Sequence, residues 1–223
     1  TANIMARSGI GTITLIDRDI VEDSNLNSQT LYIHNDIGLP KSLAAENHLK
    51  EINSKIKIIS HSIDLNKNNL QTLNNSDLIL DCTDNMSTRY LINEYCIKSN
   101  KNWIYSAAVK DKGFVMPVIT KDYCFECVFK ESKSDETCET SGILNYLASA
   151  VASIQCNETI KLLLKKPNEK NLIKIDSWNN IIGKLKISRR KDCSACKRIF
   201  RHLNSLERTV KFCGSGNYQI SIN

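Results

Sequence analysis

Four cysteines in two C-x-x-C pairs carry the clearest metal chemistry in the sequence. Cys124 and Cys127 form one pair, and Cys193 and Cys196 form the other. Two intervening residues let both thiolates of a pair face one tetrahedral ion, and two pairs complete a closed shell with no position left for substrate. A single pair would have been ambiguous with a redox dithiol. The spacing therefore predicts a structural zinc ion that joins the end of the chain to the domain; the alternative is four unrelated core thiols.

A second group of chemical residues follows two apolar runs. Asp17 and Asp19 follow "TITLI", and Asp84 and Asn85 follow "DLILD". In an open parallel sheet, ligands bind outside the carboxyl ends of strands, at the point where the strand order reverses. An acid at such a strand end often holds a ribose, and Asp17 fits that role. A strand-terminal aspartate also commonly caps a turn or the next helix, so this position alone is a weak signal.

Lys41 adds a cation to this group. It stands in the first turn of a helix predicted to start at Pro40, where a lysine opposes the helix dipole and unpaired backbone N–H groups favour an anion. A phosphate contact explains this placement better than an indifferent surface lysine does. Asp84 could then hold Mg²⁺ beside the phosphates, and Asn85 could add a hydrogen bond. Together these groups indicate a nucleoside triphosphate rather than a nicotinamide cofactor.

The order of apolar runs predicts the elements that must position these groups. We expect strands at residues 12–16, 55–60, 77–81, 103–109, 114–119, 172–176 and 184–187, helices at 87–98 and 144–164, and a terminal hairpin. Strands that alternate with helices predict an α/β fold with a doubly wound, Rossmann-like, mostly parallel sheet. Its C-terminal part would be stapled by zinc and followed by a small extension. We place the main domain at residues 1–197 and the extension at 198–223.

Composition limits the surroundings and partners of the protein. The chain has 223 residues and nine cysteines, an odd number that favours metal binding in a reducing, cytoplasmic compartment over a disulfide scaffold. The net charge of +6 is spread along the sequence without a cluster of basic and aromatic residues, which argues against a nucleic-acid partner. The most apolar long segment, residues 143–164, is interrupted by polar side chains, so we expect a buried helix rather than a membrane span.

Six segments, in this order, resemble the ThiF/MoeB/HesA family, the adenylyltransferases that are similar to ubiquitin-activating enzymes. They read "IDRDIVEDSNLNSQTLY", "GLPKSLAAENHLKEIN", "DLILDCTDNMSTRYLINEYC", "CFECVF", "SIQCNETIKLLL" and "DCSAC". The resemblance covers nearly the whole chain, and an ordered series is far more specific than one glycine-rich loop. The family implies a glycine-rich ATP loop upstream of Thr1. The tail "KFCGSGNYQISIN" resembles a small C-terminal extension of archaeal-type members.

The resemblance also implies a reaction with ATP, Mg²⁺ and Zn²⁺ as cofactors. The C-terminal carboxylate of a small ubiquitin-fold or sulfur-carrier protein, usually ending in Gly-Gly, attacks the α-phosphate of ATP. The products are an acyl-adenylate and pyrophosphate. The barrier is mainly charge repulsion between the anionic nucleophile and the phosphates, so the enzyme must supply positioned cations. The family further implies a homodimer.

The family assigns roles to particular residues. The positions expected at the nucleotide are Asp17, Asp19, Asn25, Ser28, Lys41, Asp84 and Asn85. By resemblance, Asp17 holds the ribose, Asn25 and Lys41 contact phosphates, and Asp84 holds the metal ion. We expect Asp84, Lys41 and Cys138 to take part in catalysis. Cys138 matches a cysteine that in some members receives the acyl group or a persulfide sulfur; the alternative is an incidental loop cysteine.

Two further positions leave alternatives open. The family loop usually reads S-N-L-x-R-Q, whereas this chain reads S-N-L-N-S-Q, so Ser28 stands where a phosphate-binding arginine is expected. Losing a bidentate cation at a developing anion is costly, so either another cation substitutes or the chain adenylates slowly or not at all. Arg89 matches a recurrent arginine of the family, and an ion pair on the helix surface explains it equally well.

Three functions follow from these observations. The first is ATP-dependent adenylation of a sulfur-carrier or ubiquitin-like protein, which the ordered motifs favour. The second is a catalytically impaired homologue that binds such a protein or acts as a scaffold subunit, which Ser28 favours. The third is a nicotinamide-dependent oxidoreductase, which leaves Lys41, Asp84 and the cysteine pairs unexplained.

Overall fold

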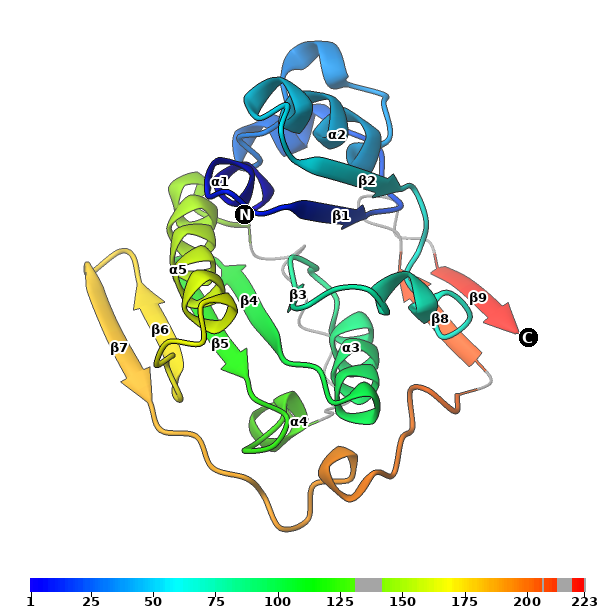
Figure 1. The fold of residues 1–223 in the computed structure, drawn as a ribbon, viewed down its shortest axis with the longest axis vertical. Helices are drawn as coiled ribbons and strands as arrows, with labels where there is room; N and C mark the ends of the chain where they lie inside the picture. Colours follow the sequence, from blue (N-terminus) through cyan, green and yellow to red (C-terminus); the bar gives the residue numbers. More distant parts are fainter. Residues whose placement is uncertain (131–141, 206, 212–217, 223) are drawn as a thin grey trace.

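The computed structural model describes residues 1–130, 142–205, 207–211 and 218–222. The helices are α1 (Ala2–Arg7), α2 (Lys41–Ile52), α3 (Met86–Ser99), α4 (Phe125–Val128) and α5 (Asn145–Leu163). The strands are β1 (Thr12–Ile16), β2 (Lys57–His61), β3 (Ile79–Leu80), β4 (Trp103–Val109), β5 (Lys112–Val118), β6 (Leu172–Asp176), β7 (Ile181–Leu185), β8 (Glu207–Lys211) and β9 (Tyr218–Ile222). Figure 1 shows this α/β arrangement. In the described part of the chain, no helix combines the length and apolar character that crossing a bilayer requires.

Strands β1 and β2 form a parallel pair that packs with α1 and α2 (Figure 1). Ala6, Leu49 and Ile58 are buried where these elements meet. Pro40 precedes α2 as its N-cap, with a ψ of 129°, so the helix begins at Lys41, one residue later than predicted. The pairing of β1 with β2 brings the segment after β1 close to the start of α2, where the backbone N–H of Lys41 donates to the carbonyl of Asp19.

Strands β3 to β7 form a separate five-stranded sheet in sequence order. Only β3 and β4 pair in parallel, whereas β4–β5, β5–β6 and β6–β7 are antiparallel. The prediction of a mostly parallel sheet is therefore wrong here. The links explain two of the three antiparallel pairs: Lys110 and Asp111 alone join β4 to β5, and residues 177–180 join β6 to β7, whereas the long segment 119–171 joins β5 to β6. The two short links form hairpins, because parallel strands need a crossover of a dozen or more residues.

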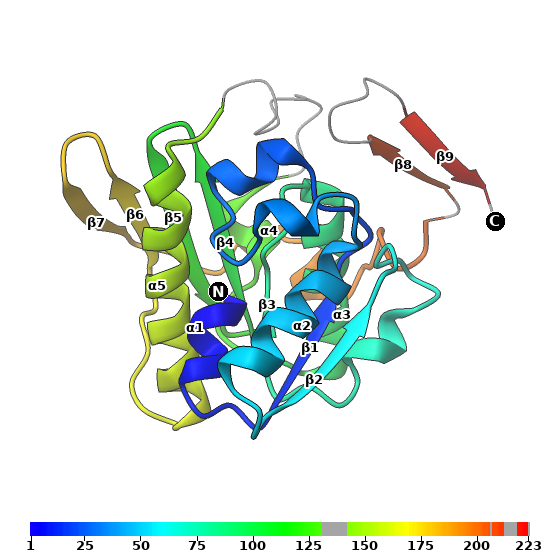
Figure 2. The same ribbon diagram turned by 90° about the horizontal axis from the view of Figure 1, so that it is seen from above.

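The two faces of this sheet bury different side chains, because successive residues of a strand point to opposite faces. On β4, Trp103 and Tyr105 join the core made with α3 and α4, whereas Ile104 joins the core made with α5. Figure 2 shows α5 lying along the sheet. Gly113 of β5 permits its close approach, since an added Cβ would lie 2.5 Å from a methyl carbon of Val151. The sheet is thus fixed between α5 on one face and α3 with α4 on the other.

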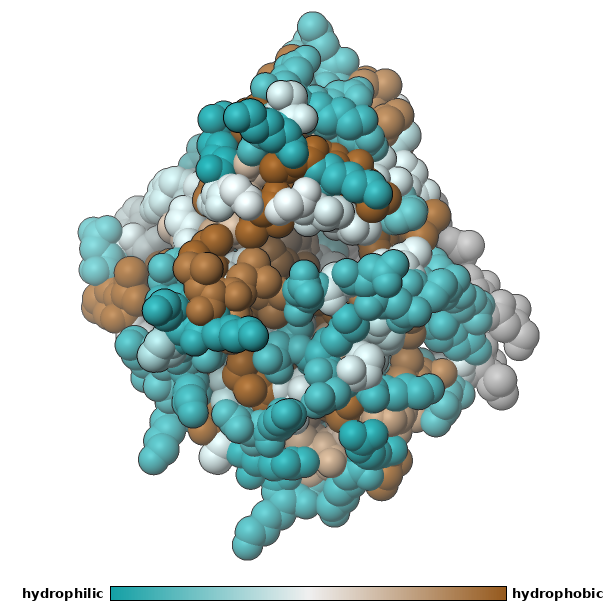
Figure 3. Space-filling view, in the orientation of Figure 1, coloured by the Kyte–Doolittle hydropathy of each residue, from teal (hydrophilic) through white to brown (hydrophobic). Residues whose placement is uncertain are grey.

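A large cleft separates the β1–β2 pair from the five-stranded sheet. Its volume is about 2260 Å³, and it is lined by residues of β1, β3 and α5 and by the segment 28–32. Figure 3 shows a hollow at the centre of this face with hydrophobic residues beside it. The segments that follow β1 and β3 both reach the cleft, through Asp17 and Asp84. The fold therefore brings the two predicted groups of strand-end residues to one place.

The chain after β7 returns to the core beside α3. Phe200 and Leu203 pack against that core. The buried carboxylate of Glu94 in α3 accepts the backbone N–H groups of Arg201 and Leu203, each at 2.8 Å. Strands β8 and β9 then form an antiparallel hairpin, as the tail predicted. The division at residues 197 and 198 stays a prediction.

Candidate functional site

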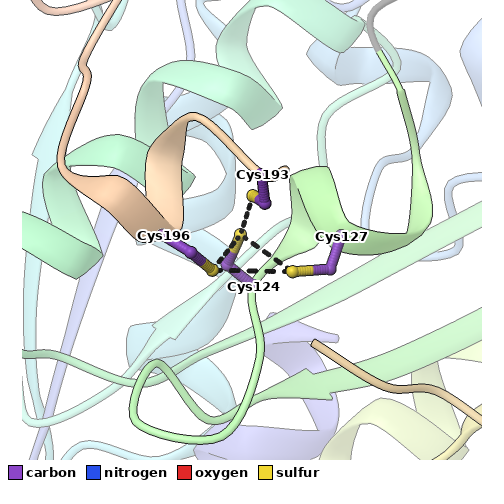
Figure 4. Close-up of side chains that lie close together, drawn as sticks. All are labelled: Cys124, Cys127, Cys193 and Cys196. Atoms are coloured by element: carbon purple, nitrogen blue, oxygen red, sulfur yellow. Dashed lines mark hydrogen bonds between the residues drawn. The ribbon is translucent and has the colours of Figure 1, made fainter. Parts of the chain in front are cut away.

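The four predicted cysteines form one compact cluster (Figure 4). Cys124 lies 3.7 Å from Cys127, 3.5 Å from Cys193 and 3.4 Å from Cys196 between sulfur atoms. Tetrahedral zinc with Zn–S bonds of about 2.3 Å requires S···S separations of about 3.8 Å, so the sulfurs are spaced to surround one ion. Among the described residues, this is the only group of three or more histidine, cysteine or carboxylate donors close enough for a shared metal. The donor set suits a structural zinc site.

Local structure positions each pair of sulfurs. Cys124 is the N-cap of α4 and Cys127 lies within that helix, while Cys196 lies in the 3-10 turn Ala195–Lys197. A hydrogen bond from the Cys124 thiol lowers the pKa of Cys127 to about 4, and the same contact raises the pKa of Cys124. Cys127 therefore favours thiolate, the form in which cysteine binds metals, whereas the raised pKa of Cys124 and, through burial, of Cys196 favours the thiol while no metal is bound. The described cysteines form no disulfides.

The predicted polar groups meet at the carboxyl end of β1. The backbone N–H of Asp19 donates to Oδ1 of Asp17 at 2.9 Å, and Lys41 donates its own backbone N–H to the carbonyl of Asp19 at 2.8 Å. The ammonium of Lys41 lies 3.2 Å from Oδ2 of Asp19, and the lysine is 8% exposed. A turn after β1 and the first residue of α2 thus hold one cation among two carboxylates.

Asp84 approaches this group from the end of β3. Burial raises the pKa of Asp17, and the charges of Asp19 and Asp84 raise it further, while a backbone hydrogen bond from Asp19 and the charge of Lys41 lower it. Such mutual effects require that these four residues share one region. Carboxylate oxygens are the ligands that Mg²⁺ prefers, and one or two of them beside substrate phosphates are its usual protein ligands. The residues present therefore fit a magnesium–nucleotide complex.

The other predicted nucleotide residues differ in their placement. Ser28 and Asn85 line the cleft together with the acids and Lys41, whereas Asn25 is not among the lining residues. The Asn25 side chain instead accepts the backbone N–H of Glu22 at 3.0 Å within its own loop. Asn85 is the N-cap of α3 and accepts the backbone N–H of Thr88 at 2.8 Å. Cys138 lies outside the described residues.

Three further residues hold this site: sequence reasoning named Arg89 without deciding its role, and it missed Gln155 and Tyr32. Arg89 is 4% exposed, so the ion pair it forms with Asp81 is buried and the surface alternative is wrong. Gln155 of α5 is fully buried and donates to the carbonyl of Asp81 at 2.8 Å. Tyr32 donates its hydroxyl to the carbonyl of Lys41 at 3.1 Å, and burial raises its pKa. The family-like segments that contain Arg89 and Gln155 were the only sequence signal for these contacts, because the spacing of residues does not show their burial.

Comparison with known proteins places the chain among relatives that it matches over most of its own length. It is 33% identical to Adenylyltransferase and sulfurtransferase MOCS3 of Aedes aegypti, over 88% of this chain and 47% of that protein. It is 30% identical to the Sulfur carrier protein ThiS adenylyltransferase of Bacillus subtilis strain 168, over 99% of this chain and 68% of that protein. The chain thus spans about half the length of MOCS3 proteins.

Solved structures give the same fold. A crystal structure of E. coli MccB with MccA-N7isoASN superposes with a TM-score of 0.76 at 24% identity, covering 87% of this chain and 63% of that one. This likeness concerns the fold alone. Residues 1–195 match the ThiF family, and the chain therefore belongs to the ThiF family.

Proposed function

We propose that this chain adenylates the C-terminal carboxylate of a small ubiquitin-fold or sulfur-carrier protein ending in Gly-Gly, with MgATP as co-substrate. Membership of the ThiF family and the similarity to a ThiS adenylyltransferase support this substrate class. The SAMP-activating enzyme E1 of Haloferax volcanii, 28% identical over 86% of this chain, supports it as well. A homodimer, as in the resemblance described above, belongs to the same proposal.

One observation carries the proposal: Asp17, Asp19, Lys41 and Asp84 converge on a single cleft between two sheets. In this scheme Asp17 accepts hydrogen bonds from the ribose, and Lys41 exchanges its contact with Asp19 for a phosphate. Asp84 holds Mg²⁺, which when bound neutralises phosphate charge. Attack by the carrier's carboxylate oxygen on the α-phosphorus breaks the bond to pyrophosphate, so one anhydride replaces another. Cys138 is proposed as a later acceptor, either of the acyl group, with release of AMP, or of the outer sulfur of a persulfide donor, with release of the donor's thiol.

The direct test is ATP–pyrophosphate exchange by the full-length protein with a Gly-Gly-ended carrier. We expect exchange that requires both carrier and Mg²⁺. Asp84→Asn should lower the rate by roughly 10²-fold or more, since it removes a charged ligand at the reacting phosphates. Asp122→Asn, which changes an acid that does not line the cleft, is the control and should leave exchange unchanged. Absence of exchange with every carrier tried would contradict the proposal.

A scaffold role is the second candidate, and Ser28 favours it. The cleft position expected to hold a phosphate-binding arginine carries a hydroxyl, and Lys41 is already paired with Asp19. Ser28→Arg should raise exchange by roughly 10- to 100-fold if a missing cation limits the reaction. Thr30→Arg adds the same charge two residues away and controls for nonspecific attraction. A carrier that binds tightly without any exchange, in wild type and Ser28→Arg alike, would support the scaffold.

A further inference from the structure

The loop between β3 and α3 carries Asp84 and is held by one buried arginine. Nε of Arg89 donates to Oδ2 of Asp81 at 2.9 Å. Nη2 of the same guanidinium donates to the carbonyl of Thr83 and to that of Ser106, the latter at 3.2 Å. One side chain therefore joins the start of the loop, its middle and strand β4.

Asp81 completes this arrangement from the other side. Its carboxylate is fully buried, and Oδ1 accepts the backbone N–H of Thr83 at 2.9 Å and the Thr83 hydroxyl at 2.7 Å. The carbonyl of Asp81 accepts the hydroxyl of Ser106 at 2.7 Å. Thr83 is thus bound through its N–H, its hydroxyl and its carbonyl, which leaves its backbone little freedom.

Asp84 lies between two residues that are both held. On one side, Thr83 is bound by Asp81 and Arg89. On the other, Asn85 accepts the backbone N–H of Thr88 at 2.8 Å as the N-cap of α3. When both neighbours of a residue are fixed, the direction of its Cα–Cβ bond is fixed as well. The backbone around Asp84 therefore fixes the origin of its side chain and limits the carboxylate to the positions that rotation about χ1 and χ2 can reach.

The donors of Arg89 are directed into the protein rather than toward a ligand. Besides the acceptors already named, Nη1 lies 3.8 Å from the sulfur of Met86, and the guanidinium carbon stands 5.1 Å from the ring centre of Tyr105. An arginine that binds phosphate needs two donors aimed outward in a fork. This geometry argues against a direct phosphate contact and in favour of action through the loop.

We infer that Arg89 is a positioning residue, whose buried contacts with Asp81 and Thr83 aim the carboxylate of Asp84 at the metal–nucleotide complex. This inference rests on the proposed function for its kinetic consequence, but not for its effect on the loop. Outer partners that orient metal ligands typically matter by roughly 10–100-fold in affinity or activity. A plain structural ion pair is the competing account, and it predicts no such effect once folding is preserved.

The test must separate loop geometry from stability, because removing Arg89 alone leaves a buried, uncompensated carboxylate. The double variant Arg89→Met with Asp81→Asn removes both charges. Lys112→Met with Asp176→Asn removes one cation and one anion of a distant pair, 2.6 Å apart, and is the matched control. Arg89→Lys keeps the charge and loses the fork. Melting temperature and zinc content would confirm that each variant folds.

Two readouts are measured on the full-length protein. The first is the Mg²⁺ concentration that half-saturates exchange, together with kcat/KM for ATP. The second needs no activity: the hydrogen–deuterium exchange rate of the backbone N–H groups of residues 83–85, followed by mass spectrometry of their peptide. We expect the double variant to lose roughly 10–100-fold in kcat/KM, to need more Mg²⁺ and to exchange these backbone hydrogens several-fold faster. Arg89→Lys should be intermediate, and the control pair should match wild type.

The outcomes are distinct. A folded double variant with wild-type Mg²⁺ requirement, kcat/KM and hydrogen–deuterium exchange at residues 83–85 would overturn the positioning role and leave a structural ion pair. If wild type itself shows no ATP–pyrophosphate exchange, the proposed adenylation fails, and the hydrogen–deuterium exchange rate alone then decides whether Arg89 orders the loop. An unchanged hydrogen–deuterium exchange rate in that case would overturn the inference too.

Discussion

Asp17 keeps a carboxylate at the end of β1 in surroundings that disfavour its charge. Burial and the neighbouring charges of Asp19 and Asp84 raise its pKa, and only a backbone N–H and Lys41 oppose them. Residues with such perturbed acidity gather at functional sites, because binding chemistry and stability make opposite demands there. Asp17 illustrates that conflict. Its carboxylate is suited to accept hydrogen bonds from a ribose, but the ionised form lowers the stability of the fold at this position.

This conflict predicts the behaviour of Asp17→Asn. A carboxyl whose folded-state pKa is raised destabilises the fold above that pKa, and this effect disappears as the pH falls below its ordinary range. The variant should therefore melt at a higher temperature than wild type at pH 7, and the difference should shrink on acidification. Its ATP affinity should fall roughly tenfold through loss of a charged acceptor. Thermal scans at several pH values and ATP titrations check both; Asp122→Asn is a surface control.

A lower melting temperature of Asp17→Asn at pH 7 would contradict this account of its charge.

At the scale of elements, the sequence predicts strands better than it predicts their directions. The apolar run at residues 12–16 and the run at 172–176 became strands with the predicted bounds, because continuous apolar residues bounded by polar ones are a local signal. The sequence analysis did not predict the antiparallel pairings, although the predicted link at residues 110–113 was already too short for a crossover between parallel strands. Burial of Arg89 was not predicted either, since it depends on Asp81, which lies eight residues away and on another element.

The contact between α3 and the C-terminal segment yields a prediction at this scale. Glu94→Gln replaces one acceptor oxygen by a donor that faces a backbone N–H of Arg201 or Leu203. A buried donor left without a partner lowers the free energy of unfolding by about 1–3 kcal/mol. Each kcal/mol lowers the melting temperature by roughly 2–4 °C in a chain of this size. Calorimetry checks this. Glu51→Gln on the exposed side of α2 is the control, and equal stability of the two variants would refute the anchoring role.

Two features of the whole molecule bring together parts of the chain that are distant in sequence. The cleft unites the β1–β2 pair with the five-stranded sheet around one polar group, and the sulfur cluster joins α4 to a turn 69 residues further along the chain. The sequence predicted both, since C-x-x-C spacing and strand-end acids are local patterns with known partners. It could not show that Asn25 turns into its own loop, because that depends on the path of the backbone after Asp23.

Metal loss should therefore act on the molecule as a whole. We expect about one zinc ion per chain, and Cys193→Ser should lose it and unfold on the order of 10 °C lower, because binding energy at a structural site is folding energy. Metal analysis and calorimetry measure the two effects. The Cys156→Ser variant, which removes a buried thiol outside the cluster, should keep its metal and serves as the control. Wild-type protein purified without chelator and free of metal would contradict the assignment.

The wide separation of the two cysteine pairs has a consequence for how the protein is made. A ribosome releases Cys124 and Cys127 long before Cys193 and Cys196 emerge, so a growing polypeptide offers only half of the coordination shell. Two thiolates hold zinc far more weakly than four, and the ion can be captured firmly only when synthesis has passed residue 196. Zinc uptake would then mark polypeptides synthesised past residue 196, while products terminated before that residue would stay open to proteases.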